Sequence, residues 1–238
     1  MKLLILGYGK MGKAIEEIAE DRGHSIEHKI NINNTQALKF IDSDDIDVAI
    51  EFSQPDAAVD NIKYCLDNGI PCVSGTTGWL DRKEEIEAYC KEKDGAFFYA
   101  SNFSLGVNLF FRLNQILADM MEQQPSYKAK LTEIHHTEKL DAPSGTAITL
   151  AEGLIDHLSS KTEWINEPSD EENVLPIISK REPDVPGTHI ISYTSDVDKI
   201  EIKHTAKSRT GFALGAVLVA EWLLDKKGVF SMDDFMKF

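Results

Sequence analysis

Short apolar runs alternate with amphipathic segments along residues 1–104. Runs rich in valine, isoleucine and leucine predict buried strands, and segments with apolar residues at helical spacing predict the helices between them. Strands that alternate with helices in this way predict a parallel sheet with helices on both faces. The predicted strands are residues 2–6, 25–32, 47–52, 71–74 and 96–100, and the helices begin near residue 11 and span 55–68 and 80–92.

The pattern changes after residue 104. A helix over residues 105–123 carries an apolar stripe that we assign to the core, without a chemical role. A polar stretch over residues 161–175 predicts a loop, and alternating residues after it predict antiparallel strands. The stripe is Leu109, Phe110, Leu113, Ile116, Leu117 and Met120. The remaining predicted elements are a strand over 127–138, a helix from 144 to about 157, strands over 177–180, 188–195 and 199–206, and a helix over 211–224.

This order predicts an α/β protein with an inserted α+β domain. We place the parallel-sheet domain at residues 1–104, the inserted domain at 105–210, and a returning C-terminal helix at 211–238. A chain of 238 residues is long enough to bury a full core in one large or two small domains.

Charge and cysteine content narrow the possible partners. Acidic residues outnumber basic ones by 40 to 25, which gives a formal charge of −15 and argues against nucleic acid or an anionic membrane as a partner. Cys65, Cys72 and Cys90 form no C-x-x-C pair, as expected in a reducing cytoplasm. We find no signal peptide or membrane span, assign no metal-binding residues, and expect a cytoplasmic protein.

A glycine turn lies between the first predicted strand and helix. Gly7, Gly9 and Gly12 form G-x-G-x-x-G, in which the glycines permit a tight turn, approach of a pyrophosphate, and close packing of helix on strand. The motif alone is weak evidence, but its position predicts a dinucleotide site and a Rossmann-type, doubly wound sheet.

The second strand leaves the choice between NADH and NADPH open. It ends in residues 31–34, which contain asparagines and neither the acidic residue that binds a ribose hydroxyl nor an arginine. Lys10 and Lys29 are close enough in sequence to approach a 2'-phosphate, but such lysines are more often simply solvated.

Three loops follow the third, fourth and fifth predicted strands: residues 52–54, 75–78 and 100–103. Ligands in parallel sheets bind beyond the carboxyl ends of the strands, so these small, polar loops favour a nicotinamide and ribose pocket over plain connections.

Two histidines and a lysine precede a predicted helix start. His135, His136 and Lys139 lie at the end of a predicted strand, where alternation puts His135 and Lys139 on one face. Ser144 is the expected N-cap of the next helix, whose exposed amides would bind a carboxylate or phosphate. Proton donors would then meet an anion site. The alternative is a histidine pair that fills a strand, followed by an ordinary helix cap.

The sequence closely resembles the dihydrodipicolinate reductase family over nearly its whole length. The most specific match is the run from Glu133 to Thr146, EIHHTEKLDAPSGT. Further matches are the glycine turn at 7–12, EFSQP at 51–55, GTTG at 75–78, SNFSLGVN at 101–108 and HTAKSR at 204–209. The glycine turn is one residue shorter than in some members, and the second strand lacks the charged pair that some members carry.

The resemblance implies reduction of a small dicarboxylate cyclic imine by NADH or NADPH in the diaminopimelate and lysine pathway. It implies that His135 is the general acid/base, Lys139 a second proton donor and His136 a substrate ligand, while Ser144, Gly145 and Thr146 clamp a carboxylate. It also implies a homotetramer formed through the inserted domain. The implied cofactor-binding residues are Gly7, Tyr8, Gly9, Lys10, Met11, Gly12, Phe52, Ser53, Gly75, Thr76, Thr77, Ala100, Ser101, Asn102, Phe103 and Arg209.

Two other classes share parts of this pattern. A homoserine or aspartate type of dehydrogenase would share the first domain, and a redox-sensing regulator would bind the nucleotide without turnover. The His-His-x-x-Lys run argues against both, since a sensor needs no proton donor beside an anion site.

Overall fold

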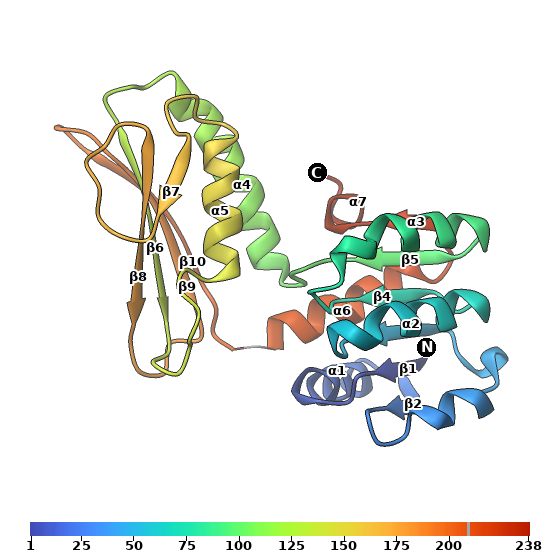
Figure 1. Cartoon of the computed structure of the whole chain (residues 1–238). Coiled ribbons are helices and arrows are strands. Elements are labelled where there is room, and N and C mark those ends of the chain that lie inside the picture. The colour runs from blue at the N-terminus through green and yellow to red at the C-terminus, as the bar shows by residue number, and fades with distance from the viewer. Residues whose placement is uncertain (209) are drawn as a thin grey trace. The chain divides into compact units, whose positions relative to one another are not determined.

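The structure is a computed structural model that describes residues 1–208 and 210–238. The chain divides into two compact units (Figure 1). Unit 1 combines Met1–Leu105 with Thr210–Phe238, and unit 2 is Gly106–Arg209. Among the helices that the structure describes, none is both long and apolar enough to cross a membrane.

Unit 1 is built on a parallel sheet with the strand order β11-β5-β4-β3-β1-β2. The order reverses beside β1, which is where doubly wound sheets bind their ligands. The predicted Rossmann-type fold is therefore confirmed. The strands are β1 (Lys2–Leu6), β2 (Ser25–Ile30), β3 (Val48–Glu51), β4 (Cys72–Ser74), β5 (Ala96–Tyr99) and β11 (Gly228–Phe230).

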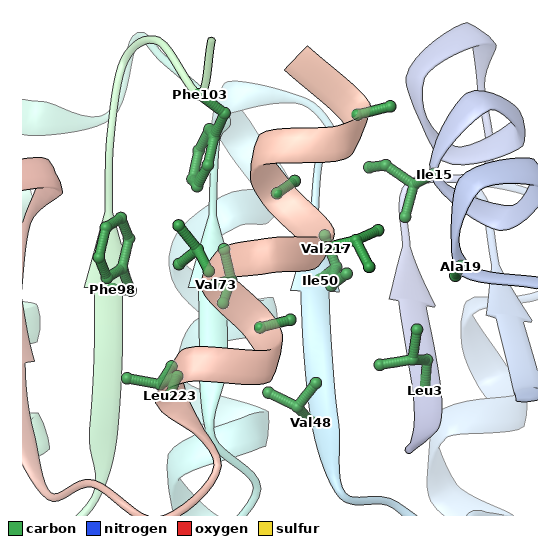
Figure 2. Close-up of a cluster of buried hydrophobic side chains, with 14 of the residues drawn as sticks. Leu3, Ile15, Ala19, Val48, Ile50, Val73, Phe98, Phe103, Val217 and Leu223 are labelled. Atoms are coloured by element: carbon green, nitrogen blue, oxygen red, sulfur yellow. The ribbon is translucent and has the colours of Figure 1, made fainter. Parts of the chain in front are cut away.

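Helices cover both faces of this sheet because successive residues of each strand point to opposite faces. In β1, Leu3 and Ile5 pack beneath α1 and α6, whereas Leu4 and Leu6 pack beneath α2 and α3. Figure 2 shows the first of these layers, where Val217 and Leu223 of α6 pack against strand residues. The helices are α1 (Lys10–Asp21), α2 (Pro55–Asp67), α3 (Lys83–Glu92), α6 (Thr210–Leu223) and α7 (Met232–Met236), with short 3-10 helices η1 (Thr35–Phe40), η2 (Ser43–Asp45) and η3 (Leu80–Arg82).

Unit 2 is a mixed sheet with helices α4 and α5 on one face (Figure 1). Its strand order is β10-β9-β6-β8-β7, and the central β6 is antiparallel to β9 but parallel to β8. The elements are α4 (Leu105–Glu122), β6 (Lys128–His135), α5 (Gly145–Ile155), β7 (Glu163–Ile165), β8 (Val174–Arg181), β9 (Thr188–Thr194) and β10 (Lys199–Thr205).

Several boundaries differ from those that the sequence predicts. The polar stretch predicted as a loop contains the edge strand β7 and the start of β8. The strand β8 is parallel to β6, because the connection between them crosses over through α5 and does not turn back as a hairpin. β11 and α7 follow the last predicted helix and are too short for hydrophobic periodicity to reveal them.

The apolar stripe of α4 is only partly core. The helix buries a face that includes Phe110, Ala118 and Met121. A second apolar row, rotated away from that face, is 45–66% exposed and consists of Leu109, Leu113, Ile116 and Met120. The assignment of the whole stripe to the core was therefore wrong, because one contact face of a helix buries only part of its circumference.

Candidate active site

A buried pair of a carboxylate and a histidine lies at the end of β6. Glu133 and His135 are two residues apart and therefore share the strand face that packs against the helices of unit 2. Glu133 Oε2 lies 2.6 Å from His135 Nδ1, and the two side chains are 0% and 10% exposed. The two atoms form a close ion-pair contact that does not meet hydrogen-bond geometry, and a carboxylate on this side of the ring leaves Nε2 as the nitrogen for proton exchange.

Arg181 binds the second oxygen of Glu133. It is the last residue of β8 and lies opposite His135 in the parallel register. Its Nη1 and Nη2 donate to Glu133 Oε1 at 3.2 and 3.1 Å. Burial alone would raise the pKa of Glu133, but the nearby side chains of His135, Ser179 and Ser144 outweigh burial and hold the pKa well below its usual value. Glu133 is therefore a carboxylate at neutral pH.

His189 connects the histidine pair to the start of α5. It lies opposite Glu133 in β9, and its ring contacts that of His135 edge to face with centroids 5.2 Å apart. Its Nε2 is 3.1 Å from Ser144 Oγ, which also accepts a hydrogen bond from the Ala147 amide at 3.2 Å. Ser144 is thus the N-cap that the sequence predicts. Burial, and then repulsion from His135, lowers the pKa of His189 to about 4, so it is neutral at neutral pH.

Lys139 lies outside β6. The predicted strand over residues 127–138 therefore ends too late, because β6 stops at His135. A turn closed by the bond from the Lys139 amide to the His136 carbonyl follows the strand. The strand alternation that placed Lys139 on the face of His135 therefore does not apply. The Lys139 ammonium instead donates to both carboxylate oxygens of Asp141 at 2.8 Å.

The predicted substrate ligands lie on two neighbouring segments. His136 is partly exposed and lines a cavity of about 400 Å³ in unit 2. Gly145 is exposed, with open space where a Cβ would lie, and Thr146 is partly buried. Because Ser144 takes the Ala147 amide, the amides of Gly145 and Thr146 are those left for an anion at the helix start. The rest of the cavity lining is Thr137, Glu138, Pro183, Asp184, Val185, Pro186 and Ser208.

The ligand atoms of Glu133, His135 and His189 lie within 4.8 Å of one another, which raises the possibility of a metal ion. Two ligands of a tetrahedral zinc ion, each roughly 2.1 Å from the metal, would be separated by about 3.4 Å. The separation of 2.6 Å between Oε2 and Nδ1 is too short for two ligands of one such ion. Arg181 beside the same carboxylate also opposes a cation. We therefore assign no metal ion to this cluster.

The glycine turn of unit 1 is tight, and two of its three glycines leave no room for a side chain. Gly7 has φ +96°, and a Cβ there would come 2.0 Å from the carbonyl oxygen of Phe52. A Cβ at Gly12 would come 2.4 Å from the oxygen of Gly7, whereas Gly9 faces open space. Within the described residues, no side chain caps α1 at Gly9. The uncovered amides of Lys10, Met11 and Gly12 therefore fit an anionic group.

Tyr8 belongs to a small charged cluster at the end of β2. Its hydroxyl donates to Glu16, which also pairs with Lys29, and the Lys29 ammonium lies 5.3 Å from the Tyr8 ring centroid. The hydrogen bond from Lys29 lowers the pKa of Glu16, and the bond to Glu16 raises that of Lys29. Lys29 is thus already paired with a carboxylate, and Lys10 is exposed.

The loops after β3 and β4 are held together by Glu51, a fully buried carboxylate that the sequence reading did not single out. Glu51 accepts hydrogen bonds from Ser74 Oγ at 2.6 Å and Thr76 Oγ1 at 2.9 Å, and from the amide and hydroxyl of Ser53. The Ser53 amide also donates to Thr76 Oγ1 at 2.8 Å. The predicted residues Ser53 and Thr76 therefore do meet at the carboxyl edge of the sheet.

The third loop joins the same edge through aromatic packing. The rings of Phe52 and Phe103 are 5.4 Å apart, and a Cβ at Gly75 would come 2.2 Å from the Phe52 ring. Phe103 and Ala100 are core residues, so their backbone and not their side chains would face a ligand. Thr77 and Ser101 are exposed, and Asn102 Oδ1 accepts from the Ser104 amide at 2.9 Å. Arg209 lies outside the described residues.

Sequence reading also missed Arg181 and His189. Glu133 carried a detectable signal, since it precedes His135 by two residues on a strand and must share its face. His189 and Arg181 are distant in sequence, and only the strand register brings them to His135.

These features define a class of protein. One part of the chain is a doubly wound sheet with a glycine-lined helix start. Another part holds a histidine, supported by a carboxylate, beside a second helix start. This combination is typical of a nicotinamide-dependent oxidoreductase.

Comparisons with known proteins define the family. The model of the dihydrodipicolinate reductase N-terminus matches residues 1–103, and that of the C-terminus matches residues 106–236. The chain belongs to the dihydrodipicolinate reductase family, an NAD(P)H-dependent family of reductases.

Individual proteins of this family are similar to the chain over most of its length. The 4-hydroxy-tetrahydrodipicolinate reductase of Christiangramia forsetii is 53% identical over 99% of this chain and 98% of its own. That of Archaeoglobus fulgidus is 36% identical over 81% of this chain and 77% of its own. The fold matches a dipicolinate-bound dihydrodipicolinate reductase from Paenisporosarcina sp. TG-14 with TM-score 0.78, at 21% identity and 97% coverage of both chains.

Proposed function

We propose that this protein is a 4-hydroxy-tetrahydrodipicolinate reductase, which reduces its cyclic imine substrate with NADH or NADPH in the diaminopimelate and lysine pathway. The observation that carries the proposal is the His135–Glu133 pair beside the Ser144-capped start of α5, because it puts a proton donor next to an anion site. Membership in the family, with full-length relatives of that name, supports the same reaction.

The two units divide the work. Unit 1, with its glycine turn and the loops after β3, β4 and β5, binds the nucleotide, whose nicotinamide supplies the hydride when bound. Unit 2 binds the substrate. His135 delivers the proton through Nε2, since Glu133 occupies Nδ1.

Charged groups of unit 2 hold the substrate dianion. The amides of Gly145 and Thr146 bind one carboxylate, and His136 contacts the substrate from the neighbouring cavity. Lys139 stabilises the negative charge that grows on the ring as it accepts hydride, which requires its ammonium to exchange Asp141 for the substrate. The pair with Asp141 is easily exchanged, because the Asp141 side chain is 60% exposed and an exposed ion pair is weak.

We also propose a homotetramer that forms through unit 2. Residues of β6 that point away from the core, such as Thr132 and Ile134, lie on the sheet face opposite α4 and α5. In the part of the chain that the structure describes, no helix of unit 2 covers this face (Figure 1). Sedimentation equilibrium tests this proposal, and a monomer at micromolar concentration would contradict it. The free, buried thiols of Cys65, Cys72 and Cys90 support a reducing, cytoplasmic location.

The decisive experiment is an assay of nucleotide oxidation with freshly generated 4-hydroxy-tetrahydrodipicolinate. We expect turnover with this imine, and we expect pyridine-2,6-dicarboxylate to compete with it because it offers the same two carboxylates. Activity on homoserine or aspartate semialdehyde, with none on the imine, would overturn the proposal. Nucleotide binding without turnover of any of these compounds would favour a redox sensor.

A further inference from the structure

The group between the two proton donors is Arg181. Its guanidinium donates to Glu133 Oε1, to the carbonyl of Lys139 from Nε at 3.3 Å, and to the carbonyl of Asp141 from Nη2 at 2.6 Å. The donors of a guanidinium lie in one rigid plane, so acceptors bound to it are held in a fixed arrangement. The carboxylate that supports His135 and the backbone that carries Lys139 are therefore positioned by one group.

Glu133, which Arg181 holds in place, in turn fixes the position of His135. It is fully buried, and a buried carboxylate is stable only when both oxygens are paired. His135 Nδ1 and Arg181 provide the two partners. The Glu133 carboxylate against Nδ1 therefore sets the orientation and the tautomer of the His135 ring.

The loop held by Arg181 spans residues 136–143, and part of this loop is exposed at the surface. The side-chain pair of Lys139 and Asp141 is at the surface and contributes little rigidity. The contact from Arg181 to the Lys139 carbonyl is partly buried, and the Arg181 side chain is 21% exposed, against 60% for that of Asp141. The position of Lys139 therefore depends on Arg181 more than on Asp141.

We propose that Glu133 and Arg181 are positioning residues that hold His135 and Lys139 in one arrangement for proton delivery and charge stabilisation. This inference rests on the proposed function, because it assigns these residues to the same site. Neither Glu133 nor Arg181 lines the cavity beside His136, and each acts through a proton donor.

Two conservative variants test it. Glu133→Gln keeps the size of the side chain but removes its charge, and we expect kcat to fall on the order of 10²-fold. Arg181→Lys keeps the charge but loses the planar fork, and we expect a decrease of roughly tenfold. Nucleotide affinity should stay unchanged in both. Arg22→Lys is the matched control, since Arg22 makes a similar two-pronged pair with Glu221 in unit 1, and it should leave kcat unchanged.

The ring tautomer distinguishes positioning from mere stability. Nitrogen NMR of histidine-labelled protein should show neutral His135 protonated on Nδ1 in the wild type, with Nε2 protonation gained in Glu133→Gln. His135→Gln identifies the signal.

The possible outcomes distinguish a failure of the proposed function from a failure of the positioning role. If the wild-type protein does not turn over the imine, the proposed function fails, and the tautomer measurement still decides the inference. If the wild type is active but both variants keep its kcat and the Nδ1-protonated ring, the positioning role is wrong. A variant in which unit 2 loses its fold, seen as lost hydrogen-exchange protection of the β9 amides, is replaced by Glu133→Asp, which keeps the charge but withdraws it from Nδ1 and should also lower kcat.

Discussion

His189 makes the stability of unit 2 depend on pH. The ring is 4% exposed, and burial first, then repulsion from His135, lowers its pKa from 6.5 to about 4. The unfolded chain therefore takes up a proton more readily than the folded one. The stabilisation is fully present above about pH 6.5 and is lost as the pH falls from there towards 4. The variant His189→Gln has no imidazole to titrate. The side-chain amide of the glutamine can still reach Ser144 Oγ, in place of the Nε2 atom of His189.

The magnitude follows from that interval. Each pH unit corresponds to about 1.4 kcal/mol, so protonating the buried ring opposes folding by about 3 kcal/mol. Between about pH 7.5 and about pH 5, the linkage relation yields roughly 2 kcal/mol of this loss. Glu133, whose pKa is lowered from 4.5, contributes little in this range because the unfolded carboxylate is still mostly ionised. His204, whose pKa burial also lowers, contributes equally to wild type and variant.

The assay must report on unit 2 alone, because two units need not unfold together. Hydrogen exchange of the β9 amides, corrected for the pH dependence of intrinsic exchange, measures the free energy of opening there. We expect the wild type to lose roughly 2 kcal/mol more than His189→Gln between the two pH values. Equal losses in both proteins would refute the conclusion that His189 is buried in its neutral form.

Four further predictions concern catalysis and nucleotide binding. His135→Gln should lower kcat by a factor on the order of 10² to 10⁴ with little change in KM, since glutamine cannot shuttle a proton. Stopped-flow or steady-state kinetics with the imine measures this effect. Normal turnover would mean that the histidine only fills the strand. Thr146→Val should act mainly on the KM of the imine, because it weakens a ground-state contact with a carboxylate, so a change confined to kcat would contradict the clamp. NADH and NADPH should bind within about tenfold of each other by calorimetry, because Glu16 already pairs with Lys29. Glu16→Gln should free Lys29 and shift the preference towards NADPH, and an unchanged ratio would show that Lys29 lies away from the 2'-phosphate.

Part of the site could be predicted because its signals are local. The glycine turn follows a strand by one residue and opens a helix, so its role depends on neighbours in sequence. Ser144 caps α5 through the Ala147 amide three residues on, which a sequence pattern also reveals. The boundary of β6 was wrong because the turn after His135 depends on Arg181 of β8, and no local pattern contains that contact.

The sequence by itself determined the fold of unit 1, the family and the residues that we propose as proton donors, since hydrophobic periodicity and short motifs act over a few neighbouring residues. Only the tertiary structure decided what surrounds those donors. Glu133, His189 and Arg181 meet at His135 because the register of β6 with β9 and β8 brings them to one sheet face. Glu51 likewise joins two loops that are separate in sequence. Strand pairing is a long-range interaction whose register results from the packing of the whole sheet, and therefore no window of sequence contains it.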